Sequence, residues 1–236
     1  MTNRLMPLAV LAAALAFAVM PFFVSFSGFD PSLYPVPQED PPAQPAGYAF
    51  SIWGVIYLWL IVMAAFGVWK RADDPDWAAT RPALLISLVI GVAWLPVAEV
   101  SPVWALILIW AMLVTALWAL MKTPARDIWL LRAPIGLYAG WLTAASAVSI
   151  ALVGHGYDLA PLSQPVWAVL AISIGLVVAV ATLMARAPLL AYAAAVVWAL
   201  IALIVQNGSA VASVSAVSAL GIAVVAGLAL MRARRG

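Results

Sequence analysis

Residues 102–121 have the sequence PVWALILIWAMLVTALWALM, with no charged side chain. An α-helix needs about 20 mostly apolar residues to cross the hydrocarbon core of a bilayer. Seven further stretches of the same character occur along the chain. The eight predicted spans are residues 5–26, 50–69, 82–97, 102–121, 133–153, 166–185, 188–206 and 210–231. We therefore predict an all-α integral membrane protein with eight transmembrane helices.

The composition of the whole chain agrees with this prediction and excludes other classes of protein. Of the 236 residues, 67% are hydrophobic and 8% are charged, whereas an average soluble domain has roughly 45–50% apolar and about 25% charged residues. A soluble enzyme, a nucleic-acid-binding protein and a disordered linker are excluded, because so few polar residues cannot cover so much apolar surface. The chain has no cysteine and one histidine, His155, which excludes disulfides, thiolate sites and multi-histidine metal or haem sites.

The basic residues are distributed asymmetrically between the segments that join the predicted helices. If the N-terminus is inside, all 11 lysines and arginines fall in inner segments and none in outer ones. The positive-inside rule therefore predicts that both termini are cytoplasmic, and it favours a bacterial inner membrane. The first stretch could alternatively be a cleaved signal peptide with Arg4 as its basic region. Its apolar run is longer than usual for such a peptide and no A-x-A site follows, which favours a retained helix.

The predicted spans lack the residues on which most membrane chemistry depends. They contain no lysine for a retinal Schiff base, and no aspartate or arginine lies at mid-depth, where ion-coupled transporters keep ionisable residues. There is no Ser-His-Asp set, no HExxH motif and no glycine-rich phosphate loop. We assign no catalytic residue, no metal site and no required cofactor.

Twelve tryptophans are the main positive feature of the sequence. Several lie near span ends, where indoles are common in the interfacial belts of membrane proteins. Two aromatic pairs lie within spans instead, and each pair shares one helix face: Trp53 with Tyr57 at i, i+4, and Tyr138 with Trp141 at i, i+3. If the two pairs face each other, they form a slot for a flat apolar molecule. Ordinary aromatic packing between helices is the alternative interpretation.

Residues 45–57, PAGYAFSIWGVIY, resemble the signature of the tryptophan-rich sensory protein family, which includes the translocator protein or peripheral benzodiazepine receptor. Family members typically have P-P-G-W-V-F-x-x-V-W-x-x-L-Y here, after a proline-rich loop. Residues 93–96, AWLP, and 134–144, PIGLYAGWLTA, resemble two further family motifs in the same order. The resemblance covers about residues 1–153 and implies a five-helix bundle with a proline-rich outer loop at residues 27–47. Residues 154–236 would then add three helices and a basic tail.

The resemblance implies a pocket beneath that loop, because family members bind porphyrins and other tetrapyrroles, sterols and synthetic ligands there. Carried over by motif position, the ligand-binding residues are Trp53, Tyr57, Trp94, Tyr138 and Trp141. Tyr48 replaces the first tryptophan of the motif, so the ligand can differ from that of other members. We expect a membrane ligand-binding or sensory protein that holds a flat hydrophobic molecule such as a tetrapyrrole.

Three other functions remain open from the sequence: passive transport of a small apolar solute, a structural role as accessory subunit of a membrane complex, and light-dependent porphyrin degradation. The expected partners are a hydrophobic small molecule and membrane lipid, with no nucleic acid. In the span at residues 210–231, Ala219, Ala223 and Gly227 form a small-residue face. Such a face lets helices approach closely, so this span could contact another subunit of a homo-oligomer or a larger complex.

Overall fold

The computed structural model describes residues 4–24, 30–186 and 188–234. The described residues form no strand and include eight helices long and apolar enough to cross a membrane, which confirms the all-α class and the number of spans. These helices are α1 (Leu5–Val19), α2 (Ile52–Lys70), α4 (Arg81–Ala98), α5 (Pro102–Met121), α6 (Ala133–Gly156), α7 (Gln164–Ala185), α8 (Leu190–Asn207) and α9 (Ala212–Ala233). The shorter elements are η1 (Met20–Phe22), η2 (Pro31–Leu33), η3 (Gly47–Ser51), α3 (Pro75–Ala78) and η4 (Ile128–Arg132).

Two predicted spans differ from the observed helices by three or more residues at one end, and the others agree within two residues. The first was predicted to continue to residue 26, but α1 ends at Val19 and the chain turns through η1, because Pro21 has no N–H and its ring clashes with the preceding helical turn. Residues 25 and 26 lie outside the described residues, as do residues 27–29 of the proline-rich loop. The fifth span is longer than predicted, since α6 continues beyond residue 153 to Gly156. His155, predicted in a loop, therefore lies in the last turn of this helix.

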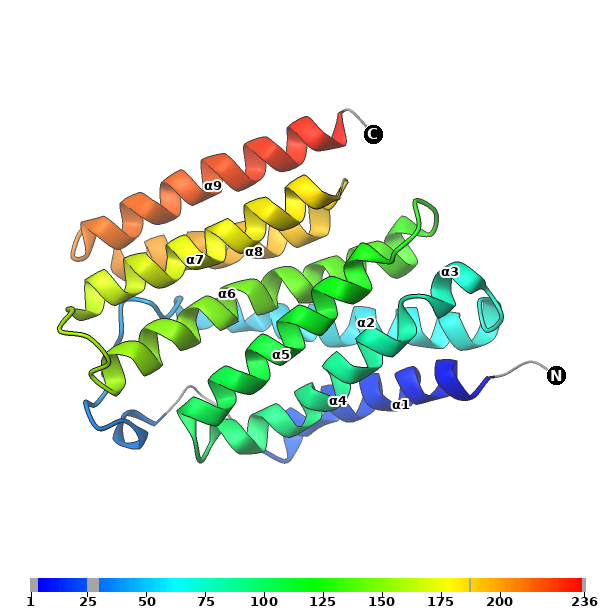
Figure 1. Ribbon diagram of the computed structural model, residues 1–236, viewed down its shortest axis with the longest axis horizontal. Helices are drawn as coiled ribbons and strands as arrows, with labels where there is room; N and C mark the ends of the chain where they lie inside the picture. The colour runs from blue at the N-terminus through cyan, green and yellow to red at the C-terminus, as the bar shows by residue number, and fades with distance from the viewer. Residues whose placement is uncertain (1–3, 25–29, 187, 235–236) are drawn as a thin grey trace.

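The helices form two rings that share α6 (Figure 1). In the first ring, α1 packs against α2 and α4, α4 against α5, and both α5 and α2 against α6. In the second ring, α6 packs against α7 and α8, and both of these pack against α9. Because α6 has neighbours on all sides, 72% of its most apolar stretch is buried, the largest share among the eight helices. The segments predicted as residues 1–153 and 154–236 are thus in contact along the length of α6.

The contact between α6 and α8 depends on small residues. A Cβ atom added to Gly140 would lie 2.3 Å from the carbonyl oxygen of Tyr192 and 2.9 Å from the Cβ of Ala195. One added to Gly136 would lie 3.3 Å from the backbone nitrogen of Tyr192. The α6 and α8 backbones can approach this closely only because Gly136 and Gly140 carry no side chain. Such small residues are typical of helix contacts in membranes.

The outer helix α9 uses one face for packing within the protein. Val214, Ser218, Gly221 and Val225 are buried against the neighbouring helices. The small-residue face predicted for contact with another subunit points elsewhere, and Ala219 and Ala223 are exposed. Contact of this face with another subunit stays a prediction.

Basic side chains gather at one end of the bundle. The start of α1 and the end of α9 lie together at this end, and the described part of the α1–α2 loop lies at the other (Figure 1). Every lysine and arginine of the described residues belongs to the end with the chain termini. Asp127 joins two connecting segments there: its carboxylate accepts hydrogen bonds from Arg71 Nε at 2.8 Å and from Trp77 Nε1 at 2.9 Å. The Arg71 guanidinium lowers the pKa of Asp127 below its usual value.

Candidate functional site

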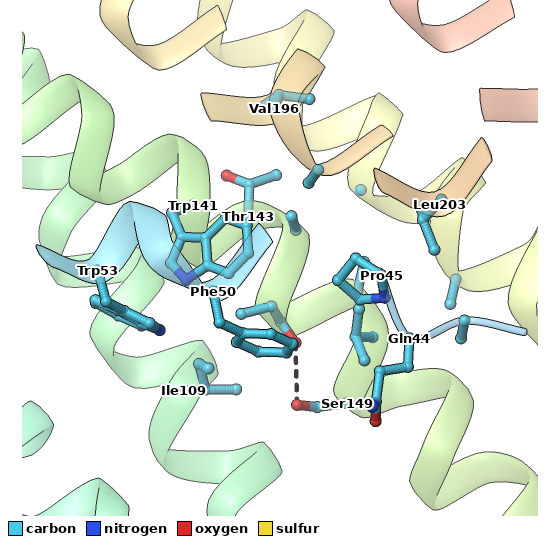
Figure 2. Close-up of a pocket in the computed structure, with 18 of the residues that line it drawn as sticks. Gln44, Pro45, Phe50, Trp53, Ile109, Trp141, Thr143, Ser149, Val196 and Leu203 are labelled. Carbon is cyan, nitrogen blue, oxygen red and sulfur yellow. Dashed lines mark hydrogen bonds between the residues drawn. The ribbon is translucent and has the colours of Figure 1, made fainter. Parts of the chain in front are cut away.

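A cavity of about 570 Å³ lies in the half of the bundle that is remote from the basic end (Figure 2). This volume is within the range of small-molecule sites, roughly 300–1,000 Å³. The α1–α2 loop contributes Ala43, Gln44 and Pro45 to the wall, directly before η3. The remaining wall comes from α1, η1, η3 and six further spanning helices: α2, α4, α5, α6, α7 and α8. The cavity therefore extends over both rings.

One side of the cavity is aromatic. Trp53 and Tyr57, one turn apart on α2, stack with ring centroids 5.3 Å apart and planes 16° from parallel. Phe17 of α1 meets both rings edge to face, at 5.7 Å from Trp53 and 5.1 Å from Tyr57. On the same side, Trp141 of α6 lies 6.2 Å from Trp53 and 5.9 Å from Phe50, each time in a T-shaped arrangement. Such edge-to-face groups present both ring faces and ring edges to a neighbouring molecule.

The structure places four of the five predicted site residues in this wall: Trp53, Tyr57, Trp94 and Trp141. Tyr138 is fully buried and does not line the cavity. Its hydroxyl lies 2.9 Å from the hydroxyl of Ser87 on α4, and its ring contacts Phe17. Tyr138 therefore packs behind Phe17, whose ring lines the cavity. The binding role of all five residues stays a prediction.

The indole N–H groups of the wall differ in their partners. Trp94 Nε1 donates a hydrogen bond to the carbonyl oxygen of Ala105 at 2.9 Å, which fixes the ring between α4 and α5. Trp141 is 2% exposed, and its Nε1 has no hydrogen-bond partner among the described residues. A buried donor without a partner costs about 1–3 kcal/mol. Trp141 therefore has an indole donor that no described residue uses, in a ring that belongs to the cavity wall.

The wall carries no charged side chain among the residues that line the cavity. Two of its hydroxyl groups are already bonded within α6. Ser149 donates to the carbonyl oxygen of Ala145 (Figure 2), and Thr143 donates to that of Ala139. No group of three or more histidine, aspartate or glutamate side chains that could hold a metal ion occurs in the described part of the chain. The arrangement suits an uncharged molecule held by contact area, ring stacking and a few hydrogen bonds.

The loop above the cavity is attached to α8. The backbone N–H of Ala46 donates to the carbonyl oxygen of Ala202 at 3.2 Å, and Asn207 Nδ2 donates to that of Pro42 at 2.9 Å. Nearby, Trp198 Nε1 donates to the carbonyl oxygen of Ala49 at 3.0 Å. The sequence motifs did not single out these residues. An asparagine at the end of a predicted span is a weak indication of such a bond, because it is equally common in a solvated turn.

A second attachment holds the loop to the end of α6. Gln38 Nε2 lies 2.8 Å from His155 Nδ1, and the backbone N–H of Val36 donates to the carbonyl oxygen of Gly156 at 2.9 Å. No role was predicted for His155. Its position in the last turn of α6 makes it an anchor for the loop that covers the cavity.

The family model for TSPO-like protein matches residues 8–231. The chain belongs to the TSPO-like family. No curated protein and no solved structure matches it. The resemblance seen in the sequence covered about residues 1–153, whereas the family match continues through α7, α8 and most of α9. These three C-terminal helices therefore belong to the region that the family model describes. With its eight apolar helices, it is a multi-pass membrane protein.

Proposed function

We propose that this TSPO-like protein is a membrane receptor that binds a flat, largely apolar molecule, such as a tetrapyrrole, in the cavity beneath the α1–α2 loop. The observation that carries the proposal is the buried indole of Trp141, whose N–H lacks a partner and lies in an aromatic wall with Trp53 and Phe50. A carbonyl oxygen or an unprotonated ring nitrogen of a ligand would accept this hydrogen bond. The aromatic rings around it would stack against the plane of the ligand.

The surrounding lipid determines which forces give selectivity. Lipid tails are as apolar as the cavity wall, so transfer of an apolar molecule from the bilayer gains little from the hydrophobic effect. Shape, ring contacts and the Trp141 hydrogen bond must therefore distinguish a ligand from lipid. Loss of a neutral hydrogen bond costs about 0.5–1.5 kcal/mol, which corresponds to roughly a 2- to 12-fold weaker binding in Trp141→Phe.

The direct test is a titration of the detergent-purified protein with protoporphyrin dimethyl ester, whose esterified carboxyl groups carry no charge, followed by tryptophan fluorescence. The Trp53→Phe/Trp141→Phe variant removes two indoles from the cavity wall. The matched control is Trp104→Phe/Trp118→Phe, which removes two indoles that are 61% and 54% exposed and do not line the cavity. We expect saturable quenching in the wild type and the control, and at least about tenfold weaker binding in the cavity variant, since it loses a hydrogen bond and ring contacts together. Equal affinity in all three proteins would refute the site.

We further propose that the basic end faces the cytoplasm of a bacterium and that the loop end faces outward, because basic residues are retained on the cytoplasmic side. The absence of cysteine makes this simple to test. Single cysteines replace Arg234 at the basic end and Asp158 at the loop end. A thiol reagent that cannot cross the membrane should label intact spheroplasts only at position 158, and labelling only at position 234 would reverse the orientation.

A further inference from the structure

The cavity continues past the aromatic wall into a second part with different chemistry, which we call the aliphatic extension. Its walls come from α7 and α8, and include Ala171, Ile172 and Leu176 on α7 and Ala199 and Leu203 on α8. In Figure 2, Val196 and Leu203 of α8 lie on the side of the cavity away from Trp53, with Phe50 between the two parts. Among the described residues, the aromatic side chains of the cavity lining come from α1, α2, η3, α4 and α6.

Small side chains keep the aliphatic extension open. Ala144 and Ala147 contribute to its wall from α6, Ala171 from α7, and Ala199 from α8. Larger side chains at these positions would fill the space, as side chains fill the interior of most proteins. Apolar side chains that line an empty space lose the van der Waals contacts that a filled space would give them. An apolar molecule in the extension would restore these contacts.

The chemistry of the aliphatic extension limits what that occupant can be. Among the described residues, the α7 and α8 side chains that line this part are all apolar. Beside them, Thr143 Oγ1 donates to the carbonyl oxygen of Ala139 and lies 2.9 Å from the hydroxyl of Tyr192, so its one donor is used. The amide of Gln44 belongs to the loop side of the wall, so a polar or charged group placed between α7 and α8 would lose its solvation without gaining a partner there. An apolar segment fits between these two helices.

We propose that the ligand of this protein carries a flexible aliphatic chain on its flat ring, and that the aliphatic extension between α6, α7 and α8 receives this chain. The inference rests on the proposed function, because the ring must lie against Trp53 and Trp141 for its chain to reach α8. The ligand class is then an uncharged ring with a saturated or isoprenoid tail. In this arrangement, the C-terminal helices select the tail and the N-terminal helices select the ring.

The test compares two ligands that share one ring: protoporphyrin dimethyl ester, and the same porphyrin with one methyl ester replaced by a dodecyl ester. Each is titrated at constant detergent against the wild type and against two variants that fill the aliphatic extension, Ala199→Phe and Ala171→Phe. The matched control is Val177→Phe on α7, where the native side chain is 68% exposed and outside the cavity. Two independent filling variants are used so that misfolding of one does not decide the result.

We expect the dodecyl ester to bind about tenfold more weakly to both filling variants, because its chain no longer fits the filled space. The dimethyl ester should change by no more than about twofold. Equal weakening of both esters, or no weakening of either, would overturn the proposal. So would a phospholipid acyl chain that co-purifies in the extension and is retained when the dodecyl ester binds. Failure of the dimethyl ester to bind the wild type would instead refute the proposed function itself, which is a separate outcome.

Discussion

Gly140 is the position where one added methyl group should disturb the protein most. In Gly140→Ala, the new Cβ would lie 2.3 Å from the carbonyl oxygen of Tyr192, whereas ordinary contacts begin at 3.4 Å. The two atoms must separate by about 1 Å. Because the contacting atom belongs to the backbone of α8, no rotation of a side chain relieves the clash. The α6 and α8 helices have to move apart.

The magnitude follows from two opposing effects. Overpacking of a close contact costs about 1–3 kcal/mol. Replacement of glycine by alanine inside a helix gains up to about 1 kcal/mol of helix propensity. We expect Gly140→Ala to lose about 1–2 kcal/mol of unfolding free energy overall. For a chain of this length, that corresponds to a decrease of roughly 2–8 °C in the unfolding midpoint.

The measurement is thermal unfolding of the detergent-solubilised protein, followed by tryptophan fluorescence at a fixed heating rate. Gly227→Ala on α9 is the matched control, because a Cβ at Gly227 meets nothing within 4 Å. This control keeps the gain in helix propensity and lacks the clash, so its midpoint should equal or exceed that of the wild type. If Gly140→Ala is as stable as Gly227→Ala, the close approach of α6 and α8 does not exist and the reasoning is refuted.

Two further predictions concern the ends of the bundle. Asp127→Asn removes the ion pair with Arg71 and should lower the unfolding free energy by about 0.5–1 kcal/mol at pH 7, as expected for a partly exposed pair. The folded-state pKa of Asp127 is lowered, so this contribution is present above the ordinary aspartate pKa and is lost as the pH falls through the folded-state value. The unfolding midpoints of the wild type and Asp127→Asn should therefore converge below about pH 4. A gap that stays constant with pH would contradict this assignment. Asn207→Leu removes the donor to Pro42 and should loosen the loop, so limited proteolysis should cut near residue 42 faster than in Val205→Leu, a change on the exposed face of α8. Equal cutting rates would show that the bond does not hold the loop.

The sequence predicted the number of helices well because each span is a long apolar run bounded by charge, proline or a polar loop. It was less accurate where a helix ends for a local reason. Pro21 stops α1 inside an apolar run, and α6 continues through His155 because the loop offers that side chain a partner in Gln38. Neither effect is visible in hydropathy alone, since both depend on a particular backbone geometry or a distant residue.

The aromatic wall could be anticipated and the aliphatic extension could not. Trp53 and Trp141 stand out because indoles at mid-depth are unusual, and family motifs identify the same positions. Ala171 and Ala199 have no such mark, since an alanine that lines a cavity and one that faces lipid have the same composition and spacing. The position of Tyr138 behind the wall was equally hidden: a spacing of three residues from Trp141 leaves the two side chains on neighbouring rather than identical faces.

The shared position of α6 also has a consequence for biosynthesis. Its mean hydropathy of 1.6 is the lowest of the eight helices, the others having 1.8 to 2.6. During synthesis α6 leaves the ribosome before α7 and α8, so its glycine-lined face enters the bilayer without the helix that covers it. This face can be covered only when Tyr192 arrives with α8. Packing around the fifth span is therefore completed only when the seventh span arrives.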